Sequence, residues 1–157
     1  MTAVSLLLSA WLGAAILFSS VVAPAAFAAL PSRTLAGALV GRILPSIFVA
    51  GMVIAAVSLA LDRRTGGRKP RVRRAALVVT ALACAAAQFV VGPRIDRVRR
   101  QIDGPIEQLP AGDARRVTFG RLHALSVAWL GVAMLSAGTA LVLASLSPRI
   151  NALRTSP

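Results

Sequence analysis

Four long stretches of the chain are almost entirely apolar and are separated by charged segments. They extend over residues 3–30, 43–61, 75–92 and 124–146. A helix that crosses a membrane needs about 20 mostly apolar residues, because each residue advances ~1.5 Å through a hydrocarbon layer of ~30 Å. In lipid every backbone amide must be bonded within the protein, and the stretches lack the alternation of barrel strands. The pattern predicts an all-α fold, an integral membrane four-helix bundle that forms a single transmembrane domain over residues 1–157.

Prolines influence where these helices are expected to begin and end. Pro24 is expected to kink or end the first helix. We interpret this helix as a retained span rather than a signal peptide, because no Lys or Arg precedes it. Pro45 leaves two starts open for the second helix. It begins near Ile43 with the proline in its first turn, or near Thr34 with a kink at Pro45.

Two linkers are rich in charge. The basic linker over residues 62–74 contains Gly and Pro, which interrupt helices. The linker over residues 93–121 has mixed charge and is expected to be partly helical. In it, Asp96 and Arg100 are spaced four apart, as in a surface ion pair. Asp113 is expected to cap the helix that leads into the last apolar stretch.

Composition supports lipid, rather than water, as the solvent of this chain. Hydrophobic residues make up 57% and charged residues only 15%, whereas a soluble domain carries about a quarter charged residues. The formal net charge is +13, with 18 Lys+Arg against 5 Asp+Glu. These charges lie in short blocks beside the apolar stretches. The expected partner is therefore a lipid bilayer with anionic headgroups, and no nucleic acid.

The same charges bear on orientation and location. Lys and Arg are divided equally between the two sides of a four-span protein, so their number alone does not orient the chain. The denser basic linker favours both termini being cytoplasmic. We expect a multi-pass protein of a bacterial plasma (inner) membrane.

Common catalytic motifs are missing from the sequence. It has no paired nucleophile and base, no phosphate-binding loop and no metalloprotease motif. Cys84 is the only cysteine, which excludes an internal disulfide, and we interpret it as a small buried apolar residue. No catalytic residue is assigned, and an enzyme is not favoured.

Four polar residues at the ends of the apolar stretches are the candidates for a polar pocket or partner interface. His123 and Ser126 are spaced to share one helix face, and Gln88 needs a partner across the bundle or the headgroup region. Arg42 borders the second stretch. A lone histidine either bonds to another helix or binds haem or a metal. No second His, Cys pair or buried carboxylate completes a metal site, so no cofactor is expected, with haem at His123 as the alternative.

Small residues spaced four apart put two small side chains on one helix face, where another helix can approach closely. Gly37 and Gly41 form such a pair, and Gly13 and Gly51 each have a small residue four positions away. We interpret these glycines as packing positions within the bundle. A homo-oligomer is left open.

Particular residues along the chain recur in one family of membrane proteins. They are Trp11-Leu12-Gly13, Val21 to Phe27, Leu30-Pro31, Ala36-Gly37, Val40-Gly41-Arg42, Pro45, Gln88, Gly92-Pro93-Arg94-Ile95, Phe119, Leu122-His123 and Ser126. In this combination the chain resembles the transmembrane protein 205-like family over nearly its whole length. The resemblance implies a small four-helix membrane protein of unassigned function. A more distant similarity to four-helix proteins of copper handling and haem biosynthesis adds weight to His123 as a haem or metal contact.

The leading hypothesis is a non-enzymatic helix-bundle protein that binds a small molecule or another protein in the plasma membrane. Two alternatives stay open. One is a haem- or metal-binding redox protein that uses His123. The other is an oligomeric subunit for the permeation of small solutes.

Overall fold

The structure is a computed structural model that describes the backbone of residues 3–62 and 70–154 and the side chains of residues 3–61 and 71–145. Within the described residues the chain contains helices and no strand, so the predicted all-α fold is confirmed. The α-helices are joined by two π-helical segments (η1 and η2) and one short 3-10 helix (η3). The elements are α1 (Ala3–Leu17), η1 (Phe18–Val22), α2 (Ala23–Ala29), α3 (Arg33–Asp62), α4 (Pro70–Ala85), η2 (Ala86–Val91), α5 (Gly92–Arg100), η3 (Ile106–Gln108) and α6 (Ala114–Arg154).

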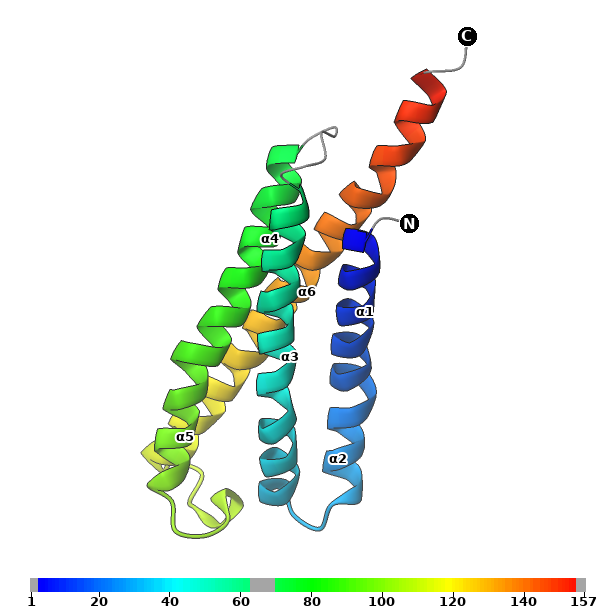
Figure 1. Cartoon of the computed structure of the whole chain (residues 1–157). Coiled ribbons are helices and arrows are strands. Elements are labelled where there is room, and N and C mark those ends of the chain that lie inside the picture. Colours follow the sequence, from blue (N-terminus) through cyan, green and yellow to red (C-terminus); the bar gives the residue numbers. More distant parts are fainter. Residues whose placement is uncertain (1–2, 63–69, 155–157) are drawn as a thin grey trace.

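These elements form four continuous helices that are long and apolar enough to cross a membrane. They are Ala3–Ala29, Arg33–Leu61, Arg71–Arg100 and Ala114–Ser145. The start of α1 and the end of α6 lie at one end of the bundle, and the α2–α3 and α5–α6 connections lie at the other (Figure 1). Many large apolar side chains are exposed, including Leu135 at 77% and Phe89 at 65%. Lipid accommodates such a surface and water does not. The chain is a multi-pass membrane protein with the predicted four-helix bundle.

The helices extend beyond the apolar stretches that predicted them. α3 begins at Arg33 and continues through Pro45, so the earlier of the two expected starts is the one observed. Of the expected basic linker, residues 63–69 lie outside the described residues, and residues 70–74 form the first turns of α4.

A π-helical turn precedes a proline in each of two spans. The segment Phe18–Val22 comes before Pro24, and the segment Ala86–Val91 comes before Pro93. A proline lacks an N–H and its ring collides with the carbonyl four residues earlier, and the wider π turn relieves that collision. Pro24 therefore does not end the first helix, which continues to Ala29.

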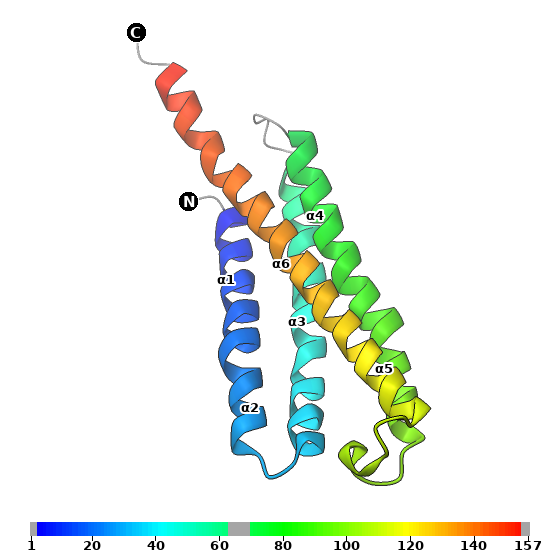
Figure 2. The same cartoon turned by 180° about the vertical axis from the view of Figure 1, so that it is seen from behind.

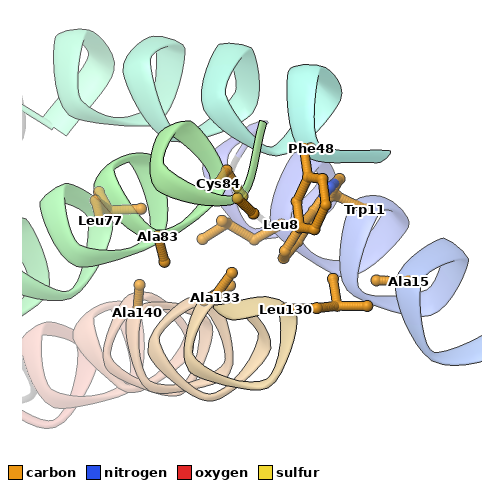
Figure 3. Close-up of a cluster of buried hydrophobic side chains, with 12 residues drawn as sticks. Leu8, Trp11, Ala15, Phe48, Leu77, Ala83, Cys84, Leu130, Ala133 and Ala140 are labelled. Atoms are coloured by element: carbon orange, nitrogen blue, oxygen red, sulfur yellow. The ribbon is translucent and has the colours of Figure 1, made fainter. Parts of the chain in front are cut away.

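The main core lies where all four spans meet, and Figure 3 shows its side chains. Small residues dominate it, so the helices approach closely. Cys84 is fully buried there, as predicted. The indole Nε1–H of Trp11 donates a hydrogen bond to the Ile47 carbonyl at 2.9 Å. The hydroxyls of Thr80 and Ser136 lie 2.8 Å apart and join α4 to α6. The buried members are Leu8, Trp11, Ala15, Phe48, Leu77, Ala83, Cys84, Ala87, Leu130, Ala133, Ala137 and Ala140.

The α5–α6 connection carries a helix cap and an ion pair. Asp113 accepts a hydrogen bond from the backbone N–H of Arg115 at 2.8 Å, so it caps α6 as expected. Its other carboxylate oxygen lies 2.8 Å from the guanidinium of Arg115. The prediction of an ion pair between Asp96 and Arg100 is wrong, since neither side chain forms an ion pair with any described residue. Both side chains are exposed, where an ion pair gains little over hydration.

Candidate functional site

A cleft of about 600 Å³ opens between α2, α3, α5 and α6 at the end of the bundle that holds the two connections. α6 crosses the bundle obliquely, close to α1 near the termini and beside α5 at the other end (Figure 2). This oblique path leaves α2 without α6 beside it, and the cleft lies there. Its lining residues are Phe27, Arg33, Thr34, Gly37, Val40, Gly41, Leu44, Ile95, Arg99, Ile102, Gly104, Ile106, Glu107, Arg116, Phe119, Gly120, His123 and Ser126.

Glycines on two facing helices keep the cleft open. Gly37 and Gly41 line it from α3, and Gly120 lines it from α6. A Cβ atom added to Gly120 would meet nothing within 4 Å. A larger side chain at Gly120 would project into the open cleft, and one at Gly37 or Gly41 would meet the Arg99 side chain that lines it.

The guanidinium of Arg99 lies on the glycine face of α3. Its nitrogens would be 3.6–3.8 Å from Cβ atoms added to Gly37 and Gly41, and Nη2 donates a hydrogen bond to the Gly37 carbonyl at 3.4 Å. The guanidinium carbon lies 5.7 Å from the centre of the Phe119 ring, a cation–π contact. These two glycines were expected to pack against another helix. What fills the space beside them is an arginine side chain from α5.

Phe119 connects Arg99 to the histidine of the cleft. The rings of Phe119 and His123 are stacked with centroids 6.4 Å apart and an interplanar angle of 2°. The two residues are four positions apart on α6, so their side chains lie one above the other on the same face. His123 is exposed on the cleft wall, whereas Ser126 is only 4% exposed.

The α5–α6 connection is fastened to the start of α3 by one threonine. The Thr34 hydroxyl donates a hydrogen bond to a carboxylate oxygen of Glu107 and accepts one from the backbone N–H of Ile106 at 3.2 Å. Gly104 turns the chain before this contact with φ 104°, a conformation that favours glycine. The segment that includes η3 is thereby held along one side of the cleft.

The bonded acids of this connection are easier to ionise than usual. The hydrogen bond from Thr34 lowers the pKa of Glu107 below its ordinary value of 4.5, with a backbone hydrogen bond and the charge of Arg33 acting in the same direction. The side-chain and backbone hydrogen bonds from Arg115 lower the pKa of Asp113 to about 2. Both carboxylates are therefore negative at neutral pH.

The four polar residues predicted for a pocket separate into two groups. His123 and Ser126 both line the cleft. Gln88 is half-buried in η2 and Arg42 is exposed on α3, and neither is a lining residue. Arg42 follows a lining glycine, but successive residues of a helix point in different directions.

Sequence reasoning did not single out Arg33, Thr34, Arg99, Glu107 or Arg116. These residues lie in or near linkers, where a charged side chain is expected to face headgroups. Two signals were available in the sequence: the spacing of Gly37 and Gly41, and the spacing of Phe119 and His123. Gly51, in contrast, lies in the core, where an added Cβ would be 2.8 Å from Cys84 and Trp11, and Gly13 faces open space. No group of three or more metal-binding side chains occurs among the residues that the structure describes.

Comparison with known proteins identifies a family for this chain. A family described as a domain of unknown function (DUF4149) matches residues 6–103, which include the glycine face of α3 and Arg99. No curated protein and no solved structure matches the chain.

Proposed function

This chain belongs to the family described as a domain of unknown function (DUF4149), and from that premise we propose that it is a non-enzymatic membrane protein that binds a small amphiphilic molecule in the cleft. One observation carries the proposal. The bundle leaves a cleft of about 600 Å³ with apolar and charged lining residues at one end of its membrane-spanning helices.

The size and lining of the cleft support a ligand with an apolar part and a polar part. Small-molecule sites in proteins have volumes of about 300–1,000 Å³, with mostly apolar walls and a few polar groups. In this cleft, the charged side chain of Arg33 and the hydroxyl of Thr34 lie at the start of α3. Val40 and Leu44 lie further along the same helix, the latter roughly 16 Å away at ~1.5 Å per residue. An apolar tail beside these side chains would place a polar head near the α5–α6 connection.

Blocking the cleft tests this function. We expect Gly120→Trp to fill the cleft, because the glycine lines it and an added side chain meets open space. Gly131→Trp is the matched control, since this glycine also lies on α6 with nothing within 4 Å and does not line the cleft. The full chain and both variants are purified in mild detergent, and bound molecules are extracted and identified by mass spectrometry.

The expected result is an amphiphile present in about one copy per chain in the native protein and in Gly131→Trp, and depleted in Gly120→Trp. Lipid that only coats the outside of the helices should be extracted in equal amounts from all three proteins. Equal amounts of every extracted molecule across the three proteins would argue against a ligand in the cleft.

Haem is the second candidate ligand, favoured by the position of His123 on the cleft wall. A haem has an apolar ring and two carboxylates, for which arginines of the same cleft are suitable partners. A visible absorption band in the purified protein that disappears in His123→Ala would support haem, and a colourless preparation would remove it.

We also propose a finer family relationship and a location. The glycines, prolines and His123–Ser126 pair noted in the sequence support a place within the transmembrane protein 205-like family. The four spans and the basic residues beside them support a bacterial plasma membrane. Separation of inner and outer membranes from a bacterium that expresses the chain checks the location.

A further inference from the structure

We infer that the ligand of the cleft carries an anionic oxygen-bearing headgroup, a phosphate or carboxylate, and that Arg99 is the residue that recognises it. The inference rests on the proposed function, which requires only an amphiphile of any charge.

Positive charge exceeds negative charge in the cleft. Among the described residues that line it there are three arginines and a single carboxylate, that of Glu107. Glu107 already accepts a hydrogen bond from Thr34. None of the three arginines forms an ion pair with a described carboxylate. Positive charge that faces an apolar cavity is costly without a counter-charge, so an anion is favoured over a neutral or cationic ligand. The three arginines are Arg33, Arg99 and Arg116.

Arg99 is held by contacts on two other helices. The Gly37 carbonyl of α3 accepts a hydrogen bond from its guanidinium and the ring of Phe119 on α6 makes a cation–π contact with it, so the group has a defined position before any ligand arrives. A guanidinium has five N–H donors in a planar fork, and the one hydrogen bond that Arg99 donates uses only one of them. The remaining donors suit two oxygens of a phosphate or carboxylate.

The other two arginines are less suited to this role. Arg116 donates a hydrogen bond from Nη1 to the Leu109 carbonyl at 2.6 Å, so it fastens the α5–α6 connection. Arg33 is exposed at the first residue of α3 and is not held by aromatic or glycine contacts. Arg99 and Arg116 are both half-buried, but of the three arginines only Arg99 is held on two sides, by the Gly37 carbonyl and by the Phe119 ring.

The experiment compares two lipids that share an acyl chain and differ in headgroup charge. Oleoyl lysophosphatidic acid and oleoyl lysophosphatidylcholine are titrated into the full chain in a neutral maltoside detergent, and bound lipid is counted by native mass spectrometry. In a separate titration, inorganic phosphate is added as a competitor to the chain with bound lysophosphatidic acid. The same titrations are made on Arg99→Gln, Arg99→Lys and Gly41→Leu, with Arg97→Gln as the control because Arg97 is exposed on α5 and outside the cleft.

We expect the native chain to bind the lysophosphatidic acid at least ~10-fold more tightly than the lysophosphatidylcholine, because charge-assisted hydrogen bonds to a fork are strong. Arg99→Gln should remove that preference and leave lysophosphatidylcholine binding within about 2-fold. Arg99→Lys should recover part of it, since it keeps the charge without the fork. Gly41→Leu keeps the arginine but displaces it and narrows the cleft, so it should weaken the binding of both lipids and that of lysophosphatidic acid more strongly, even if Arg99→Gln does not fold. Arg97→Gln should bind as the native chain does.

The remaining outcomes separate this inference from the function on which it rests. Equal binding of both lipids, unchanged in Arg99→Gln, would overturn the inference and leave an amphiphile-binding protein. No binding of either lipid would overturn both. Displacement of bound lysophosphatidic acid by an equal concentration of inorganic phosphate would overturn the assignment of an amphiphile and show a site for the free anion.

Discussion

Gly41 and Gly51 lie on the same helix, α3, and the structure uses them in opposite ways. At Gly51 an added Cβ would be 2.8 Å from the Cys84 sulfur and from the Trp11 ring, so the missing side chain lets neighbouring helices touch. At Gly41 the nearest atoms would be the Arg99 guanidinium nitrogens at 3.6–3.8 Å, beside an open cleft. The same residue type therefore serves a dry packed core in one region and provides room for a cation in the other.

The difference extends to the surroundings of each glycine. Around Gly51 the four spans bring together small apolar residues, and interiors of this density respond to the addition of a single methyl group. Around Gly41 the distances are longer, and an added Cβ would meet the Arg99 guanidinium at an ordinary contact distance. We therefore expect changes in the core to affect the stability of the whole bundle, and changes near the cleft to affect the cleft alone.

The largest expected effect comes from Gly51→Ala. A Cβ at 2.8 Å from a sulfur and a ring forces the helices apart, and overpacking of this kind costs about 1–3 kcal/mol. Gly41→Ala is the matched control, because its Cβ makes ordinary contacts. Thermal unfolding of the full chain in detergent measures both. A Gly51→Ala protein as stable as Gly41→Ala would mean that the core is not packed as described.

A smaller effect is expected from Thr80→Val, which keeps the shape of the side chain and removes the hydroxyl that meets Ser136 across α4 and α6. Hydrogen bonds between membrane helices contribute about 0.6–1.7 kcal/mol. The control is Thr139→Val, whose hydroxyl bonds only to the Leu135 carbonyl of its own helix. Unfolding in detergent should distinguish the two, and equal losses would show that the bridge between the helices adds nothing.

The smallest expected effect is local and depends on pH. Because the folded protein lowers the pKa of Glu107 below 4.5, the stabilisation by its contact with Thr34 is fully present above pH 4.5 and is lost as the pH falls through the lowered value. The Ile106 amide, which donates to Thr34, should then exchange its hydrogen faster relative to the intrinsic rate. Hydrogen exchange followed by mass spectrometry between pH 7 and about pH 3 checks this.

Two comparisons sharpen that measurement. Thr34→Val removes the partner of Glu107, so its Ile106 amide should exchange fast at every pH. The cap at Asp113 should hold to a lower pH, because its pKa lies at about 2. Loss of protection at the start of α6 together with that at Ile106 would contradict the separate roles of these two carboxylates.

Part of the site was present in the sequence as incomplete signals. His123 and Ser126 were predicted as polar neighbours, and both line the cleft. Gln88 and Arg42 were grouped with them because each borders an apolar stretch, but the structure places neither among the residues that line the cleft. The pairing of Gly37 and Gly41 was visible, although the pattern of small residues is the same for a helix contact and for a side-chain contact.

The sequence by itself determined that this chain is all-α and has four helices that are long and apolar enough to cross a membrane. It could do so because lipid offers no hydrogen-bond partner to the backbone. The N–H and C=O groups of a long apolar stretch must therefore bond to one another, which a helix allows. Only the tertiary structure decided that Arg99 meets Gly37 and that Thr34 meets Glu107, residues 62 and 73 positions apart in the chain. Such contacts depend on how each helix is rotated and on the oblique path of α6, which hydrophobic periodicity along one segment does not encode.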